Sequence, residues 1–373
     1  DTTFTISEAM STYDHEANKM FIVKRQDPDG VEFWKLSEID KAKFMAARVK
    51  EITALVDKGA LRIMSVKESE EFAKLHGAEF VLDSGFVEKW KRTDDDVIAK
   101  SRHVIKGWQD PMVLQIERTA PAPTAEDEAA IFQVVASNQW DGYVGDVKNA
   151  FGQSIPSNRK TPIACRQPPE GIPGMKPGEL LLCITECYGL VSGPAWWRVS
   201  LVGWLESVGY FRHPLAPCLM ILPCEKDDVS RDKHTDGVMS IRTDDMFEGG
   251  EPRHRALMDK MRERFEFGKY KRLLDDASGT MLNGRRVMQL EDKSFRSNMT
   301  AYAKSLKPIK IGRKLKSEDG MPIALGPGEL TVCRGVNGGI QWLASNGRPE
   351  LAAAASIIPR GFPEPDASLI VDL

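Results

Sequence analysis

The chain has 373 residues, 42% of them hydrophobic and 28% charged, with a formal net charge of −3. This composition excludes an intrinsically disordered protein, and the small net charge excludes a uniformly basic nucleic-acid-binding protein. No apolar run approaches the roughly 18 residues that a membrane-spanning helix needs, so we expect no membrane partner. At this length two or three subdomains are expected.

The chain begins at Asp1-Thr-Thr-Phe without an initiator Met and without the basic and apolar regions of a signal peptide. We therefore expect a segment cut from a longer polyprotein. The cysteines lack the paired spacing of zinc ligands, which favours buried thiols in the core of an intracellular protein. They are Cys165, Cys183, Cys187, Cys218, Cys224 and Cys333.

Residues 37–61 carry apolar side chains at three- and four-residue spacing, which predicts an amphipathic helix. Ser37, with Asp40 three positions later, is a candidate cap for its start, and Gly59 is a candidate stop. We expect this helix to serve packing rather than chemistry.

Residues 80–109 change to a pattern of two strands around a charged turn. Lys100, Arg102 and Lys106 are spaced by two and four residues, so a strand would project all three from one face. A row of cations on a sheet face suits a triphosphate or a nucleic-acid backbone. The alternative is an exposed strand whose charges protect an edge.

A proline-bearing connector at 119–124 precedes a predicted helix over 126–137. The next apolar segment, beginning at Tyr143, predicts a strand that ends near Asp146, with Phe151 five residues beyond it. Further along, residues 180–184 predict a short strand and residues 195–208 a helix that stops at Gly209.

Residues 237–250 read as strand, tight turn and strand, with Asp244 and Asp245 at the tip of the hairpin. Two adjacent carboxylates repel each other unless a cation neutralises them, and hard divalent ions prefer oxygen ligands. Asp146 supplies a second acidic strand end upstream, which favours a metal site over a merely solvated turn.

The C-terminal third predicts a basic helix over 253–267, a hairpin over 278–290 with Asn283-Gly284 as its turn, and a helix over 294–306. A basic loop at 307–329 then precedes helical structure over 331–358 that is broken at 346–349. Residues 253–272 carry a charge excess of +5 and residues 285–316 one of +8. A polyanion would suit these segments, although a solvated basic surface explains them equally well.

Six motifs follow one another in the order found in copia-type retrotransposon reverse transcriptases, and the chain resembles that family over about residues 40–360. They are Lys100-Ser-Arg-His-Val-Ile-Lys-Gly-Trp-Gln109, Gly145-Asp-Val-Lys-Asn-Ala-Phe151, Arg166-Gln-Pro-Pro-Glu-Gly171, Tyr188-Gly-Leu190 with Pro194 and Trp197, Gly209-Tyr-Phe with Pro217-Cys-Leu219, and Arg334-Gly-Val-Asn-Gly-Gly-Ile-Gln-Trp-Leu with Arg348-Pro-Glu-Leu351. Each motif is short, but their shared order is a strong signal.

The resemblance implies an α+β fold, a right-hand polymerase with an antiparallel palm sheet, interleaved fingers and a helical thumb. Residues 1–75 would form an N-terminal extension that carries the amphipathic helix. Residues 76–275 would form the fingers and palm, and residues 276–373 a thumb and connection-like region.

The resemblance also implies the site. Asp146, Asp244 and Asp245 would be catalytic carboxylates and ligands of Mg²⁺, with Mn²⁺ as the alternative ion. Lys100, Arg102 and Lys106 would face the triphosphate or template, and Phe151 would exclude a ribonucleotide 2′-hydroxyl. The partners would be an RNA template, a DNA or tRNA primer and deoxynucleoside triphosphates, inside a cytoplasmic virus-like particle or the nucleus; the oligomeric state is not predicted.

Two departures from the family pattern affect the site. Arg242 stands where the family usually has an aromatic residue or His, and a cation there competes with Mg²⁺. Ser192 stands where the family has a Gln that would touch the incoming nucleotide. Three hypotheses follow: an RNA-directed DNA polymerase, a catalytically decayed remnant that only binds nucleic acid, and an unrelated metal-dependent phosphoryl enzyme.

Overall fold

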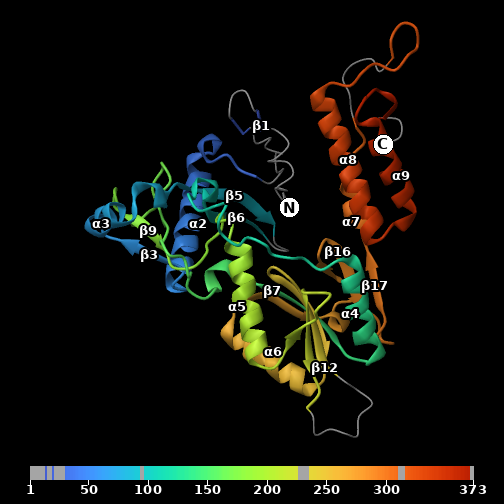
Figure 1. Ribbon diagram of the computed structural model, residues 1–373, viewed down its shortest axis with the longest axis horizontal. Coiled ribbons are helices and arrows are strands. Elements are labelled where there is room, and N and C mark those ends of the chain that lie inside the picture. The colour runs from blue at the N-terminus through green and yellow to red at the C-terminus, as the bar shows by residue number, and fades with distance from the viewer. Residues whose placement is uncertain are drawn as a thin grey trace. The chain divides into compact units, whose positions relative to one another are not determined.

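The computed structural model describes residues 13–14, 19–20, 30–92, 96–225, 235–309 and 316–369. The fold mixes helices with mostly antiparallel sheets (Figure 1). Two compact units share the chain, and both are discontinuous in sequence. Unit 1 comprises residues 1–120 and 149–201, and unit 2 comprises residues 121–148 and 202–373. The predicted division into an N-terminal extension (1–75), fingers and palm (76–275) and a thumb region (276–373) concerns functional subdomains and stays a prediction.

In its described residues, unit 1 contains two two-stranded sheets, a four-stranded sheet and two α-helices that precede α5. Its helices are α2 (Glu38–Asp57), α3 (Val66–His76) and the first part of α5 (Gly193–Ser207), with short 3-10 turns at η1 (Phe33–Lys35), η2 (Ala78–Phe80), η3 (Gly107–Gln109) and η4 (Ala150–Gln153). Its strands are β1 (Tyr13–Asp14), β2 (Lys19–Met20), β3 (Leu61–Met64), β4 (Val81–Leu82), β5 (Ser84–Arg92), β6 (Val97–Ile105), β8 (Ala164–Cys165) and β9 (Leu180–Cys183).

Several local features predicted for unit 1 are confirmed. The hydroxyl of Ser37 accepts from the backbone N–H of Asp40 and caps α2, and Gly59 follows the helix with φ +70°. Helix α2 packs on β6, which pairs with β5 as predicted, although part of the turn between them lies outside the described residues. Three of the cysteines belong to the buried core of this unit: Cys165, Cys183 and Cys187.

Unit 2 is built on a six-stranded sheet in the order β10-β11-β12-β13-β7-β14 and on a three-stranded sheet β15-β16-β17. Its strands are β7 (Gly142–Val147), β10 (Phe211–Arg212), β11 (Leu219–Pro223), β12 (Thr235–Arg242), β13 (Asp245–Gly250), β14 (Phe267–Arg272), β15 (Thr280–Leu282), β16 (Arg285–Gln289) and β17 (Phe295–Asn298). Its helices are α4 (Ala125–Ser137), α6 (Pro252–Arg264), α7 (Thr300–Ser305), α8 (Pro327–Asn346) and α9 (Ala352–Ile357), with 3-10 turns at η5 (Leu273–Asp275), η6 (Pro349–Leu351) and η7 (Ile358–Gly361).

Helices α4 and α6 pack against the central strands β12 and β13. Side chains alternate between the faces of a strand, so the two helices can be assigned to faces. Phe247 shares an apolar cluster with Ile131 of α4, whereas the next residue, Glu248, hydrogen bonds to His254 of α6. The two helices therefore cover opposite faces of the large sheet.

Several predicted elements of unit 2 are confirmed, and two are wrong in part. The Asn283-Gly284 turn has both residues at positive φ, +50° and +78°, as a two-residue hairpin with a type I′ turn requires. The predicted helix over 253–267 ends at Arg264, and Phe267 starts strand β14, which pairs with β7. The first part of the predicted helix over 294–306 is strand β17, paired with β16. In both cases sheet pairing overrides local helical periodicity.

The C-terminal helices α8 and α9 run side by side, as Figure 1 shows. Helix α8 begins at Pro327, four residues before the predicted start, because Gly326 caps it and Glu329 reaches back to the Gly326 N–H. The break predicted at 346–349 is present at Gly347. No helix among the residues that the structure describes is long and apolar enough to span a membrane.

Candidate active site

Asp146 and Asp245 lie directly opposite each other on the neighbouring antiparallel strands β7 and β13. The N–H of Val147 donates to the carbonyl of Asp244 at 2.9 Å, so the Asp146–Asp245 pair occupies a non-hydrogen-bonded position of the ladder. At such positions the Cα atoms are about 4.5 Å apart and the side chains approach most closely. The structure therefore brings together the two acidic strand ends that the sequence singled out.

Asp244 lies in the two-residue turn between β12 and β13, next to Asp245. Thr243, the first residue of this turn, has a φ of +52°, a left-handed conformation that β-branched residues rarely adopt. The predicted hairpin over 237–250 is thus confirmed, with both aspartates at its tip.

Four charged residues form a row across four strands of the sheet, and we call them the charge row: Arg242 on β12, Asp245 on β13, Asp146 on β7 and Lys269 on β14. Each member is the direct cross-strand partner of the next, so their side chains share one face. A bulge at Gly268 sets Lys269 opposite Asp146, because the register shifts between Phe267 and Lys269. A Cβ at Gly268 would lie 2.9 Å from Oδ2 of Asp146.

The electrostatics of the row are those of a crowded acidic site. Burial, followed by the charges of Asp244 and Asp146, raises the pKa of Asp245 to about 6. Attraction from Arg242 and Lys269 acts in the opposite direction and offsets only part of this effect. Burial also lowers the pKa of Arg242, although the charge of Asp245 opposes that shift.

The carboxylates fit a hard divalent cation in their chemistry, since such ions prefer oxygen ligands and would relieve the repulsion at Asp245. Among the described residues, however, no three His, Cys, Asp or Glu side chains are gathered closely enough to hold a metal ion as they stand. The aspartates therefore offer suitable donor atoms at neighbouring positions of the sheet, but they are not already arranged as a complete set of metal ligands.

The cationic residues predicted on one strand face are divided by the structure. Lys100 and Arg102 lie on β6, but Lys106 lies beyond its end, where its N–H bonds to the carbonyl of Asp83 and its ammonium is 3.5 Å from the Asp83 carboxylate. The single strand face that we expected for all three is therefore wrong for Lys106. Burial, followed by repulsion from Arg102, lowers the pKa of Lys100.

Arg102 and Phe151 are joined through Tyr188. The Arg102 guanidinium lies 4.7 Å from the centre of the Tyr188 ring, and that ring lies 4.6 Å from the ring of Phe151. Backbone contact fixes the position of Tyr188, because the N–H of Ile105 donates to the carbonyl of Tyr188 at 2.8 Å. A Cβ at Gly189 would lie 2.0 Å from the carbonyl oxygen of Ile105, so only glycine permits the approach.

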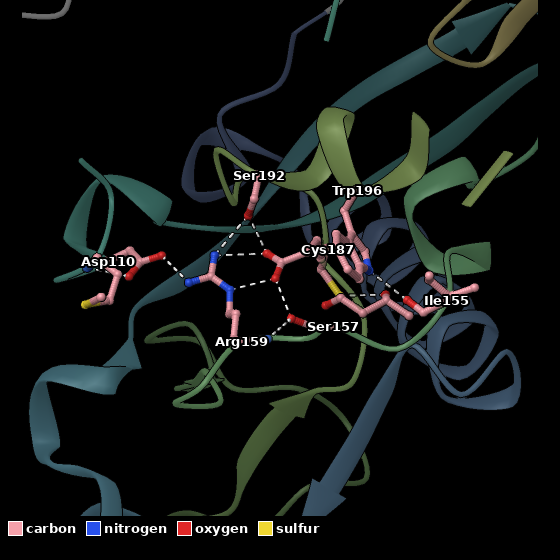
Figure 2. Close-up of polar contacts among 10 residues, drawn as sticks. Asp110, Ile155, Ser157, Arg159, Cys187, Ser192 and Trp196 are labelled. Carbon is pink, nitrogen blue, oxygen red and sulfur yellow. Dashed lines mark hydrogen bonds and ion pairs between the residues drawn. The ribbon is translucent and has the colours of Figure 1, made fainter. Parts of the chain in front are cut away.

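Ser192 is 3% exposed and belongs to a buried polar network in unit 1 (Figure 2). Arg159 donates to Ser192 Oγ and to Glu186 Oε2, both at 2.9 Å, and Ser192 in turn donates to Glu186. Arg159 also pairs with Asp110 at 2.7 Å. The Ser192 hydroxyl is therefore occupied by protein groups, and its expected role beside a nucleotide stays a prediction.

The predicted site residues fall into both units. Asp146, Asp244 and Asp245 belong to unit 2, whereas Lys100, Arg102, Lys106, Phe151 and Ser192 belong to unit 1. Sequence reasoning missed three residues beside these groups: Lys269, Tyr188 and Trp342, whose ring lies 5.8 Å from the Arg242 guanidinium. Tyr188 and Trp342 lie within two of the quoted motifs, and Lys269 lies in the basic segment 253–272, just beyond the predicted helix over 253–267.

Comparison with known proteins supports a retroelement relationship. No family model matches the chain. The chain is 25% identical over 269 residues to the retrovirus-related Pol polyprotein from transposon RE1 of Arabidopsis thaliana. The match covers 69% of this chain but only 17% of that polyprotein. The chain is thus a distant relative of a retrotransposon Pol polyprotein.

Proposed function

We propose that the chain is the reverse transcriptase segment of a copia-type retrotransposon polyprotein, an RNA-directed DNA polymerase that extends a primer 3′-OH. The observation that carries this proposal is the opposition of Asp146 and Asp245 across β7 and β13, with Asp244 in the adjoining turn. The distant similarity to a Pol polyprotein supports the same class.

In this proposal the six-stranded sheet of unit 2 is the palm, the β5–β6 hairpin belongs to the fingers and the α8–α9 pair belongs to the thumb. Asp146, Asp244 and Asp245 would hold Mg²⁺, or Mn²⁺ in its place. The bound ion would supply Lewis-acid stabilisation of the charge that develops on the primer oxygen and the pyrophosphate.

The residues of unit 1 act on the incoming nucleotide. Lys100, Arg102 and Lys106 attract its triphosphate or the template phosphates by charge, and the contact of Arg102, Tyr188 and Phe151 adds aromatic surface to the same unit. In the same proposal, Phe151 selects deoxynucleotides and Ser192 replaces the amide that the family presents to them.

The basic segments bind the template–primer duplex. Of the stretch 285–316, residues 310–315 lie outside the described part of the chain, but Arg286, Lys293 and Arg296 are described on and around β16 and β17. An RNA template and a DNA or tRNA primer are the partners, and the cytoplasm or nucleus is the compartment in which they would meet.

The test is primer extension on poly(rA)/oligo(dT) with Mg²⁺ or Mn²⁺. We expect product from the wild-type chain and a loss of at least about 1,000-fold in Asp146→Asn and Asp244→Asn, because each removes a metal-binding charge. Asp259→Asn on the exposed side of α6 is the matched control and should leave the rate unchanged. Equal product from the Asp146→Asn variant would contradict the proposal.

Arg242 favours a second candidate, a decayed copy that binds nucleic acid without turnover. Arg242 is the direct cross-strand partner of Asp245 in the hairpin, where a cation opposes metal binding. Duplex binding without product in the wild-type chain, together with extension restored in Arg242→Tyr, would favour this candidate over the active enzyme.

A further inference from the structure

The charge row contains two cations and two carboxylates, so the two cations offset the formal charge of the two carboxylates, and Asp244 in the adjoining turn adds one further negative charge. Arg242 and Lys269 occupy its two ends, and each lies directly across the ladder from one carboxylate. Opposite charges at directly opposed positions attract, and the interaction strengthens where water is partly excluded. Both aspartates are half-buried.

Arg242 is held in this place by contacts that do not involve the aspartates. Its Nη2 donates to the carbonyl of Pro123 at 3.3 Å, just before α4, and its guanidinium lies against the ring of Trp342 on α8. Its buried Nε has no hydrogen-bond partner among the described residues. These contacts keep a cation beside Asp245 even though the pair makes no close salt bridge in the described structure.

Lys269 is placed by the bulge at Gly268 and is exposed to solvent. In a regular ladder that kept Phe267 opposite Val147, Gly268 would stand opposite Asp146. The bulge in β14 therefore determines that a cation, rather than a glycine, stands across from Asp146.

We propose that Arg242 and Lys269 are built-in counter-ions of Asp245 and Asp146 and that they weaken the binding of a divalent cation at the charge row. The inference rests on the proposed metal-binding role of the aspartates and goes beyond it, because it assigns two residues that oppose that role. Removing either cation should increase metal affinity even when no nucleic acid is present.

The test is titration of the full chain with Mn²⁺ alone at neutral pH and low salt, with free Mn²⁺ measured by electron paramagnetic resonance. We expect Arg242→Met and Lys269→Met each to bind Mn²⁺ at least about tenfold more tightly than wild type. Arg242→Lys keeps the charge and should stay near wild type. Lys260→Met, an exposed position on α6, removes one charge away from the row and should also stay near wild type.

Asp245→Asn shows where the ion binds. The increase in Mn²⁺ affinity caused by Arg242→Met should vanish when Arg242→Met and Asp245→Asn are combined. Wild type, Arg242→Met and Lys269→Met could instead bind Mn²⁺ with the same affinity, and this binding could depend on Asp245. That result would overturn the inference while leaving the metal site in place. Absence of Asp245-dependent binding in every variant would overturn the inference and the metal-binding part of the proposed function. The expected affinity pattern without primer extension would support the inference and contradict only the polymerase.

Lys269 is exposed, so its variant should fold even if Arg242→Met does not. Thermal unfolding with and without Mn²⁺ provides a second readout, because tighter binding raises the unfolding temperature more. A larger Mn²⁺-induced shift in Lys269→Met than in Lys260→Met supports the inference, and equal shifts contradict it.

Discussion

Asp146 and Asp245 are direct cross-strand partners although about a hundred residues separate them in sequence. Burial of the charge on Asp245, followed by repulsion from Asp244 and Asp146, destabilises the fold when no cation is bound. The metal-binding role proposed for the pair therefore conflicts with the stability of the fold.

We expect Asp245→Asn to stabilise the metal-free protein, because the neutral amide removes both the repulsion and the burial of a charge. The pKa of Asp245, raised to about 6, corresponds to an increase of up to about 3 kcal/mol in the free energy of unfolding of Asp245→Asn at neutral pH. Chemical denaturation in the presence of a chelator measures it. Asp259→Asn should leave stability unchanged, and a loss of stability in Asp245→Asn would contradict the prediction.

The buried network of Arg159 in Figure 2 should be costly to break. Arg159→Met leaves the carboxylates of Glu186 and Asp110 buried without their counter-ion, so we expect a loss of about 3–5 kcal/mol. Arg62→Met is the matched control, because Arg62 pairs with Glu68 at the surface of the same unit and should lose less than about 1 kcal/mol. Similar losses of unfolding free energy in both variants would contradict the prediction that burial determines the cost of breaking these ion pairs.

His103 should give unit 1 a distinctive dependence on pH. Its side chain is 1% exposed beside Phe86, neither ring nitrogen has a hydrogen-bond partner among the described residues, and burial lowers its pKa from 6.5 to about 4. Because the unfolded chain takes up this proton first, the stability contribution is complete above pH 6.5 and is lost as the pH falls toward 4.

The measurement is the free energy of unfolding of wild type and His103→Phe from pH 7 to pH 4. The wild type should lose about 3 kcal/mol more than the variant over this range. The difference between the proteins removes the titration of the carboxylates that do not interact with His103; Glu51 interacts with it by charge and stays part of the difference. Parallel curves for the two proteins would contradict the prediction.

Gly237 makes room for a buried imidazole beneath the large sheet. A Cβ at this position would lie 2.2 Å from Nδ1 of His254, which is hydrogen bonded to Tyr210 at 2.7 Å, while Nε2 is hydrogen bonded to Glu248 at 2.8 Å. The ring cannot move without breaking both bonds. We therefore expect Gly237→Ala to destabilise the protein by about 2–4 kcal/mol.

Gly203→Ala is the matched control for this substitution. Gly203 lies in α5, and a Cβ there would meet no atom within 4 Å, so alanine should stabilise the helix by up to about 1 kcal/mol. Thermal unfolding of both variants gives the comparison, and an unchanged unfolding temperature in Gly237→Ala would contradict the close approach to His254.

Features determined by a few neighbouring residues were predictable from the sequence. Ser37 caps α2, Asn283-Gly284 turns the β15–β16 hairpin, and the hairpin over 237–250 lifts Asp244 and Asp245 to its tip. In each case the deciding contacts lie within a few residues, so local propensity and turn chemistry suffice. The acidic strand end at Asp146 was visible for the same reason.

Only the tertiary structure decided which strands pair and in what register. Local periodicity predicted helix at Phe267 and over 295–298, where pairing with β7 and β16 gives strands instead. The opposition of Asp146 to Asp245, the bulge that brings Lys269 beside them and the burial of Ser192 all depend on residues far apart in sequence. Register follows from packing both faces of a sheet at once, and no short stretch of sequence contains that information.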